Sequence, residues 1–582
     1  MGLPLLSAKA RRKRKKKKAV VCRPAPKRKV TAAAKPSAAP KRKPVRKKAP
    51  ACAKPKPKPR ARPKTPPMPA GDGMHPAAPA PPKPSTTAPK ASAPSKPTAA
   101  PKPTAAPKPA TPPKAPPPPP PPPPPATPEV VPPVPVTGAA YDGPVHSGPF
   151  GVRQAERLLW RAGFGPRPGD GERLAALGLH GAVDSLMRPG GAPVLSGPEP
   201  TYVSDGVVRP INPETSWGHD HLAWLDRMIR SSHQLSERMA LIFHDWFATT
   251  DAAVGSQRLM RAQSDLFRRR ALGSFEELVV EVTRDPAMLI FLSGTSNRKG
   301  SINENYAREV MELFALGANR GAYTEADVRE LARALSGFRN DWSNELRHHN
   351  FRWDATRWDD KPKTVFGKTG NYGWEAAARL VVQHPQHPSF FVRKLWSYFV
   401  PVEPPAATAA ALERLYVASG LQVGPVVEAI LKSPELYGPR MVKPPVVHHA
   451  GMMRALGKHV TADHWVWLAD GAGQKLHHPP DVAGWRDDAW LDTSTIRGRW
   501  EVVNRVLDGD SVPTSHPEET PAEAVDRALA FWGRPEVADE TVAALVAWSA
   551  TSVAGLPWGD KWSQVQNALR QLIPMSPDYL TS

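Results

Sequence analysis

The sequence has only two cysteines among its 582 residues, and both of them, Cys22 and Cys52, lie near the amino terminus. The remainder therefore has no disulfide, no thiolate metal site and no cysteine nucleophile. No apolar run approaches the 18 or so residues of a membrane span. The motifs HExxH, GxSxG, P-loop and GxGxxG are also absent, which excludes the enzyme classes that depend on them.

Residues 1–140 contain no Phe, Trp or Tyr and only two acidic residues, Asp72 and Glu129, against 32 of the 79 Lys and Arg. They also hold 42 of the 73 prolines. Such a segment cannot bury enough apolar surface to offset an ordering entropy of about 1–2 kcal/mol per residue, so we predict a disordered tail. Ten consecutive prolines at 116–125 predict a polyproline II spacer of roughly 30 Å.

The strong basicity of the chain comes from this tail. Residues 141–582 keep 47 of the 79 basic and 52 of the 54 acidic residues, together with all 18 tryptophans. Basic blocks such as RRKRKKKK at 11–18 attract polyanions, so nucleic acid, anionic lipid or a cell-wall polymer is the expected partner. Without aromatics the tail cannot stack on bases, which predicts no sequence specificity. The amino terminus has charge but no apolar stretch after it, so no secretory signal is visible.

From residue 150 onward, apolar residues recur at helical spacing between short Gly and Pro breaks, which predicts an all-α, multi-helical globular domain over 141–582. Ser301 and Glu304 have the spacing of a capping box, and Gly317 suits the end of the same helix. The stretch 338–370 is aromatic, rich in turn residues and not periodic, so we expect a large loop with one hairpin there.

One face of the helix predicted over 301–317 is polar. At 100° per residue, Glu304, Arg308, Glu309 and Glu312 fall within an arc of about 140°. These residues fit a surface helix with Glu304–Arg308–Glu312 ion pairs at i,i+4 spacing. They also fit a cleft in which Glu309 and Glu312 act as acid/base groups or bind a divalent metal.

A second candidate lies in the segment RMALIFHDWFATT, which is apolar nearly all round and should therefore be buried. His244 and Asp245 interrupt it and point about 100° apart, so they do not pair with each other. Buried polar groups need partners or a purpose. His244 therefore belongs either to an internal hydrogen-bond network or to a catalytic or metal-binding site.

Three weaker signals involve histidines and carboxylates. They are His219-Asp220-His221 at the start of a helix, His348-His349 with Asp354 in the aromatic loop, and His477-His478-Pro479-Pro480-Asp481 in an extended loop followed by Gly484-Trp485. The first has the His-x-His pattern of metal hydrolases, but on a helix where that pattern needs a strand, and the second has a spacing that matches no standard metal pattern.

Several blocks together resemble the bacterial family catalogued as domain of unknown function 1800 over residues 150–582. The blocks are LLWRAGFGP (158–166), RMALIFHDWFAT (238–249), NENYARE…MELFALG (303–317), YTEADVRELARALSGF (323–338), VRKLWSYFV (392–400) and PPDVAGW (479–485). The resemblance implies no activity, but members are commonly predicted to be exported, which suggests an envelope role. It draws attention to Asn303–Glu312, Arg161, His244, Phe247 and Trp485.

The resemblance also shows two departures. The family usually has Arg-His-Asp after the aromatic loop, where this chain has Arg357-Trp358-Asp359. It usually has Pro-Pro-Asn-Val where this chain places a charge at Asp481. Either change implies a shifted or a degenerate site.

Two functions follow. The first is a non-catalytic assembly or scaffold protein, associated with the envelope or a polyanion and carrying a cationic tether. The alternative is a hydrolase-like enzyme with an acid/base or metal site on a helical scaffold, built from Glu304, Arg308, Glu309, Glu312 and His244. Glu309, Glu312 and His244 are its metal-ligand candidates.

Overall fold

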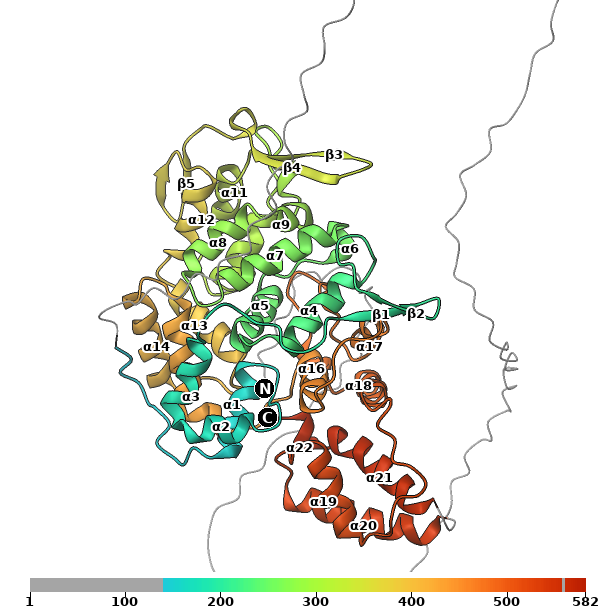
Figure 1. Ribbon diagram of the computed structural model, residues 1–582. Coiled ribbons are helices and arrows are strands. Elements are labelled where there is room, and N and C mark those ends of the chain that lie inside the picture. Colours follow the sequence, from blue (N-terminus) through green and yellow to red (C-terminus); the bar gives the residue numbers. More distant parts are fainter. Residues whose placement is uncertain (1–139, 557–559) are drawn as a thin grey trace, which may run out of the picture. The chain divides into compact units, whose positions relative to one another are not determined.

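The computed structural model describes residues 140–556 and 560–582, so the predictions of a disordered tail and a polyproline spacer lie outside the described residues. Twenty-two α-helices and three small antiparallel hairpins make up the described part (Figure 1). The predicted all-α fold class is confirmed.

The helices follow the predicted periodic segments closely, and most of the loops between them are short. They are α1 (Val152–Ala162), α2 (Asp170–Ala176), α3 (Gly178–Met187), α4 (His219–Arg230), α5 (Gln234–Trp246), α6 (Asp251–Val254), α7 (Gln257–Arg269), α8 (Phe275–Thr283), α9 (Pro286–Phe291), α10 (Asn305–Glu309), α11 (Glu325–Ala334), α12 (Trp374–Val382), α13 (His387–Ser397), α14 (Ala406–Ala418), α15 (Val423–Lys432), α16 (Pro445–Ala455), α17 (Trp465–Gly471), α18 (Thr493–Val506), α19 (Pro521–Phe531), α20 (Asp539–Gly555), α21 (Lys561–Leu572) and α22 (Pro577–Leu580).

The helix predicted over 301–317 differs from its prediction in two ways. It begins at Asn305, and Ser301 forms a β-bridge with Arg298 instead of a capping box. After Glu309 the chain continues as a π-helix, Val310–Ala315. A π turn holds more residues than an α turn, so the 100° projection fails at Glu312. Gly317 ends the helix as predicted, with a left-handed φ of 87°.

The aromatic stretch forms two hairpins, one more than expected. Their strands are β3 (Phe338–Ser343) with β4 (Arg347–Trp353), and β5 (Lys363–Val365) with β6 (Lys368–Gly370). A third hairpin, which the sequence analysis missed, pairs β1 (Thr201–Ser204) with β2 (Val207–Pro210). It was missed because β2 is exposed on every residue and lacks an alternating pattern.

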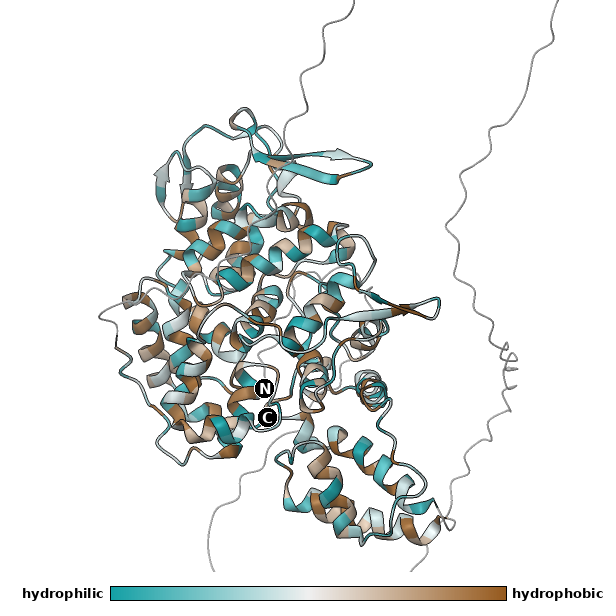
Figure 2. Cartoon of the chain, viewed as in Figure 1, coloured by the Kyte–Doolittle hydropathy of each residue, from teal (hydrophilic) through white to brown (hydrophobic). Residues whose placement is uncertain are grey.

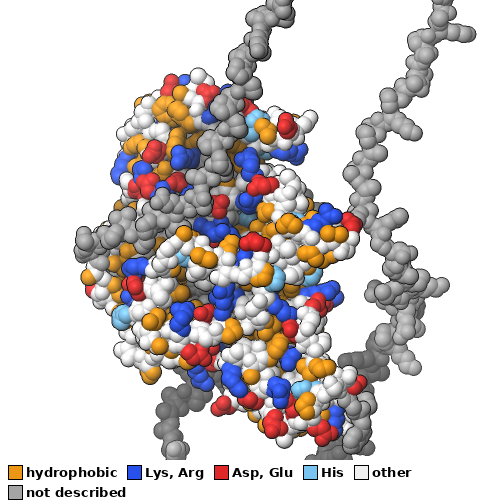
Figure 3. All heavy atoms as spheres, viewed as in Figure 1, with side chains coloured by type: hydrophobic (Ala, Val, Ile, Leu, Met, Phe, Trp, Pro, Cys, Tyr) orange, Lys and Arg blue, Asp and Glu red, His pale blue; other side chains and the backbone are white. Residues whose placement is uncertain are grey.

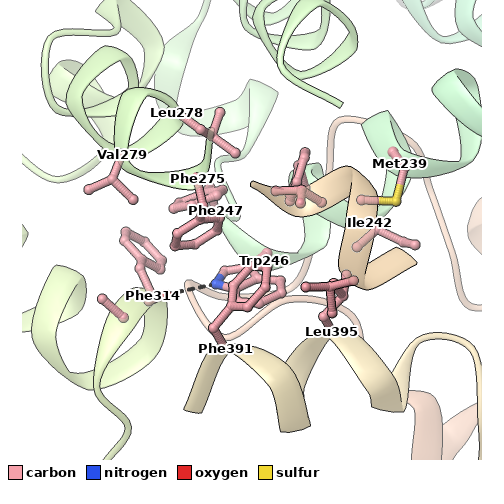
Figure 4. Close-up of a cluster of buried hydrophobic side chains, with 14 of the residues drawn as sticks. Met239, Ile242, Trp246, Phe247, Phe275, Leu278, Val279, Phe314, Phe391 and Leu395 are labelled. Atoms are coloured by element: carbon pink, nitrogen blue, oxygen red, sulfur yellow. Dashed lines mark hydrogen bonds between the residues drawn. The ribbon is translucent and has the colours of Figure 1, made fainter. Parts of the chain in front are cut away.

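Two large hydrophobic cores and a small third cluster, formed by Val254, Leu259, Met260 and Ala287, stabilise the helices. The first gathers α1, α3, α5, α7, α8 and α10–α15, and Figure 4 shows its aromatic centre around Trp246, whose indole N–H donates to the Phe314 carbonyl over 2.9 Å. The second joins α4 to α16–α18 and to the helices from α19 to the carboxyl terminus. Helix α5 contributes Ile242 to the first core and Leu241 to the second. It therefore runs along the boundary between them.

The described part exposes polar, charged and apolar side chains. Helices show brown and teal faces in Figure 2, as amphipathic helices packed on a core should. On the face shown in Figure 3, basic and acidic side chains are interspersed. Among the described residues, no helix is both long and apolar enough to span a bilayer.

Candidate functional site

The polar face of α10 is a partly exposed ion-pair network. The Arg308 guanidinium donates two hydrogen bonds of 2.8 Å to Glu325, at the first turn of α11, and one of 3.2 Å to Glu304. Hydrogen bonding to Glu325 raises the pKa of Arg308. The Glu304–Arg308 pair was predicted, whereas Glu325 takes the second place that the sequence analysis gave to Glu312. Arg308, Glu304 and Glu325 are therefore hydrogen-bonded to one another.

Glu309 and Glu312 lie beside this network, and both are half-buried. Burial, and then the charge of Glu312, raise the pKa of the neighbouring Tyr323 to about 12. In the described part of the chain, no group of three or more His, Asp or Glu side chains is arranged to hold a metal ion. An acid/base role for this face stays a prediction.

His244 lies elsewhere, fully buried on α5. Its ring centroid is 5.3 Å from that of Trp224, 5.4 Å from that of His477 and 5.6 Å from that of Trp485. Neither ring nitrogen has a hydrogen-bond partner among the described residues. Burial lowers the pKa of His244 to about 3, so the imidazole is neutral.

Asp245 points to a different set of groups, as the sequence predicted. It accepts hydrogen bonds from the Tyr398 hydroxyl, over 2.7 Å, and from the Trp485 backbone N–H, over 2.6 Å. Burial raises the pKa of Asp245 to about 6. A Cβ on Gly484, whose φ is 100°, would lie 2.3 Å from the Asp245 carboxylate. Asp245 thus fixes the 479–485 loop against α5.

The structure brings together two motifs that the sequence analysis considered separately. Asp251, at the start of α6, accepts a hydrogen bond of 3.2 Å from His221 Nε2 and one of 2.5 Å from His478 Nδ1. The Asp251 backbone N–H donates to the His477 carbonyl over 2.8 Å. The His477 ring lies 5.5 Å from His221, at right angles to it. The result is a His–Asp–His arrangement next to His244.

Asp251 was not among the predicted site residues, because it belongs to no recognisable motif. The only available signal was the presence of histidine pairs at 219–221 and 477–478, which lie far apart in the sequence. The structure joins them through a left-handed residue, His477, with φ of 55°. Such a conformation is uncommon outside glycine, and it turns the chain so that His478 reaches Asp251.

Burial acts to raise the pKa of Asp251, but hydrogen bonds from the two histidines outweigh it and hold the pKa well below the usual range. The carboxylate is therefore ionised and can only accept, so each histidine presents an N–H to it. A neutral His478 imidazole with its proton on Nδ1 keeps a lone pair on Nε2. The His478 side chain is 37% exposed.

Behind Asp251, His221 is nearly fully buried and is also held near Asp220. Its Nε2 is 3.7 Å from Asp220 Oδ1, and Gln257 donates to the same oxygen over 2.8 Å. His221 Nδ1 has no partner among the described residues, and neither does either nitrogen of His449. Both rings line a small cavity of about 10 Å³, about the room that one water molecule requires.

The residues of the other predicted histidine site, His348, His349 and Asp354, each bind a different partner and do not form one site. Asn340 donates to His348 Nδ1 over 2.9 Å, the His349 ring bonds the Arg347 carbonyl over 3.0 Å, and Asp354 accepts from Thr356 and Arg339. These contacts form the exposed β3–β4 hairpin and its end.

At both positions where the chain departs from the family pattern, the residues that are present have interaction partners. Lys363 lies over the Trp358 ring at 4.1 Å, and Asp359 pairs with Arg333 over 2.9 Å. Asp481 accepts the Ala483 N–H over 2.8 Å. An Asn side-chain oxygen can accept the same bond, so the change to Asp481 preserves this turn.

Fold and site thus define an all-α protein with a His–Asp–His arrangement next to His244 on α5. Residues 157–581 match the family described as "Protein of unknown function (DUF1800)", and the chain belongs to that family. No curated protein and no solved structure matches the chain.

Proposed function

We propose that the helical domain is a hydrolase-like acid/base enzyme that acts on ester bonds, with His478 as its reactive group. One observation carries the proposal: Nδ1 of the half-exposed His478 ring lies 2.5 Å from the ionised Asp251 carboxylate, so a neutral imidazole that donates Nδ1–H there keeps its lone pair on Nε2. A positioned imidazole of this kind removes a proton from water at neutral pH.

The reaction would proceed in two proton transfers. His478 Nε2 takes a proton from a water molecule as the water oxygen bonds to the ester carbonyl carbon. The bond from that carbon to the alcohol oxygen then breaks, and the imidazolium returns its proton to the departing oxygen. Asp251 orients the ring and stabilises the imidazolium, as a carboxylate does for a catalytic histidine.

His221 is a positioning residue in this scheme. Its hydrogen bond to Oδ2 of Asp251 leaves Oδ1 directed at His478. The hydrogen bond between Gln257 and Asp220 fixes the start of α4, from which His221 projects. Burying these polar side chains costs free energy, and positioning Asp251 gives that burial a function.

The test uses the full chain with p-nitrophenyl acetate as an ester probe and p-nitrophenyl phosphate as a comparison. We expect ester hydrolysis to fall about 100- to 10,000-fold in His478→Ala. His348→Ala, on an exposed hairpin, is the matched control and should keep wild-type activity. Absence of hydrolysis by the wild type, or equal activity in His478→Ala, would overturn the proposal.

The non-catalytic assembly or scaffold protein is the second candidate, and the composition of the tail favours it. In that case the buried histidines are structural and residues 1–140, with 32 Lys and Arg against two acidic residues, bind a polyanion. Replacing the basic residues of 11–18 by Gln should weaken the binding of the full chain to DNA or anionic vesicles and make that binding less steeply dependent on salt.

A further inference from the structure

Two tryptophans form an exposed stack close to the His478 site. Trp217 lies in the turn before α4 and Trp467 lies on α17, with ring centroids 4.8 Å apart and planes at 27°. They are 59% and 58% exposed. Tryptophan is mostly buried in soluble proteins, so two large rings left in solvent side by side indicate a binding surface.

The fold holds the pair in place. Gln257 donates to the Ser216 carbonyl over 2.9 Å, immediately before Trp217. After it, a Cβ on Gly218 would be in van der Waals contact with Val466, at 3.4 Å, so this turn lies beside α17. Trp467 follows the buried Val466 on that helix. The rings are therefore pre-organised, which lowers the entropy cost of binding.

The stack is also connected to the proposed reactive group. Lys475 Nζ lies 5.6 Å from the Trp217 ring centroid and 5.9 Å from that of Trp467. The backbone N–H of His478 donates to the Lys475 carbonyl over 3.2 Å. Gln257 bonds both Ser216, beside Trp217, and Asp220, beside His221. Two separate contacts thus place the stack next to the His–Asp–His arrangement.

We infer that Trp217, Trp467 and Lys475 form a sugar-binding subsite, and that the substrate is an esterified, uncharged polysaccharide. A pyranose ring has an apolar C–H face that packs on an indole and a hydroxyl rim to which a lysine donates. The inference rests on the proposed function only for the ester; the sugar subsite stands on its own observations.

The size of the patch favours a sugar over a protein partner. Two indoles at these exposures offer roughly 200–300 Å² of apolar area. A stable protein interface buries about 800 Å² on each partner. A sugar ring is of the right size for this surface.

The local charge favours a sugar over a nucleic acid. A single-strand binding surface combines aromatic rings with a basic groove that follows the phosphates. Here Lys475 is accompanied by the exposed Asp470, three residues from Trp467 and so on the same side of α17. Residues 141–582 also have more acidic than basic side chains.

The experiment titrates the full chain with cellohexaose and chitohexaose by calorimetry. We expect at least one of them to bind, and its Kd to rise at least 10-fold in Trp467→Ala and in Trp217→Ala. Trp342→Ala is the matched control, because Trp342 is 54% exposed on β3 but lies outside the stack. Its Kd should equal that of the wild type. Trp467→Phe keeps an aromatic ring and should bind with intermediate affinity if the variants fold normally.

Three results would overturn the inference: no binding of either sugar by the wild type, an equal loss in Trp342→Ala, or tighter binding of a dT12 oligonucleotide that Trp467→Ala removes. His478→Ala separates this test from the proposed function. It should bind the hexasaccharide like the wild type while losing ester hydrolysis. If the wild type binds sugar but cleaves no ester, the function fails and the subsite stands.

Discussion

The α10 face and the His478 site both combine a carboxylate with nitrogen donors, yet their chemistry differs. At α10, Arg308 and Glu325 join through two parallel hydrogen bonds. The arginine cannot give up its proton at any ordinary pH, so the pair has nothing to transfer. At the other site, Asp251 holds an imidazole, a group that can both take up and release a proton. The nature of the partner, more than the presence of acids, separates an ion-pair network from an acid/base site.

The largest expected effect comes from a variant that tests this difference between the two sites directly. Asp251→Asn removes the charge that orients His478, and we expect ester hydrolysis to fall about 100-fold or more. Glu309→Gln and Glu312→Gln should change activity less than threefold. Steady-state kinetics on the three variants decide between the sites. A 100-fold loss in Glu309→Gln with wild-type activity in Asp251→Asn would establish the α10 face instead.

The second prediction concerns acid stability. Burial lowers the pKa of His244 and of His449 to about 3, so between about pH 6.5 and pH 3 only the unfolded state protonates them. Each therefore makes the free energy of unfolding fall as pH falls, by about 1.4 kcal/mol per pH unit. Burial raises the pKa of Asp245 and of Asp285 to about 6, and these two oppose the trend above about pH 4.

A difference measurement isolates one histidine from the opposing acids. Urea unfolding of the wild type and His449→Phe at several pH values should give slopes that differ by one proton between pH 4 and 6. Parallel curves would show that His449 is charged in the folded protein.

The third prediction tests the attachment of the 479–485 loop. Gly484→Ala places a Cβ against Asp245 at a left-handed φ, and we expect it to lower the free energy of unfolding by about 2–4 kcal/mol. Gly509→Ala is the matched control: its φ is 86°, and nothing lies within 4 Å of the added Cβ. It should cost only the backbone strain, about 1–2 kcal/mol. Equal losses measured by chemical denaturation would show that Gly484 is not sterically required.

Much of the fold could be predicted because helical periodicity is a local signal. Helices such as α5 and α8 lie where their apolar residues recur. The π turn after Glu309 could not be predicted, because it depends on packing rather than on local pattern. For the same reason, only part of the site could be predicted from the sequence. Buried His244 follows from its apolar neighbours, whereas the meeting of His221, Asp251 and His478 requires the tertiary fold.

The smallest expected effect is the coupling free energy of the ion pair at α10. A double-mutant cycle between Arg308 and Glu325 should give a coupling of about 0.2–1 kcal/mol, because Glu325 is mostly exposed and water screens the pair. The coupling should shrink further in 1 M salt, where the Debye length is about 3 Å. Ester hydrolysis should be unchanged in both single variants. A coupling above about 3 kcal/mol that resists salt would instead mean that this pair is desolvated in the folded protein, and the contrast with Asp251 would then no longer hold.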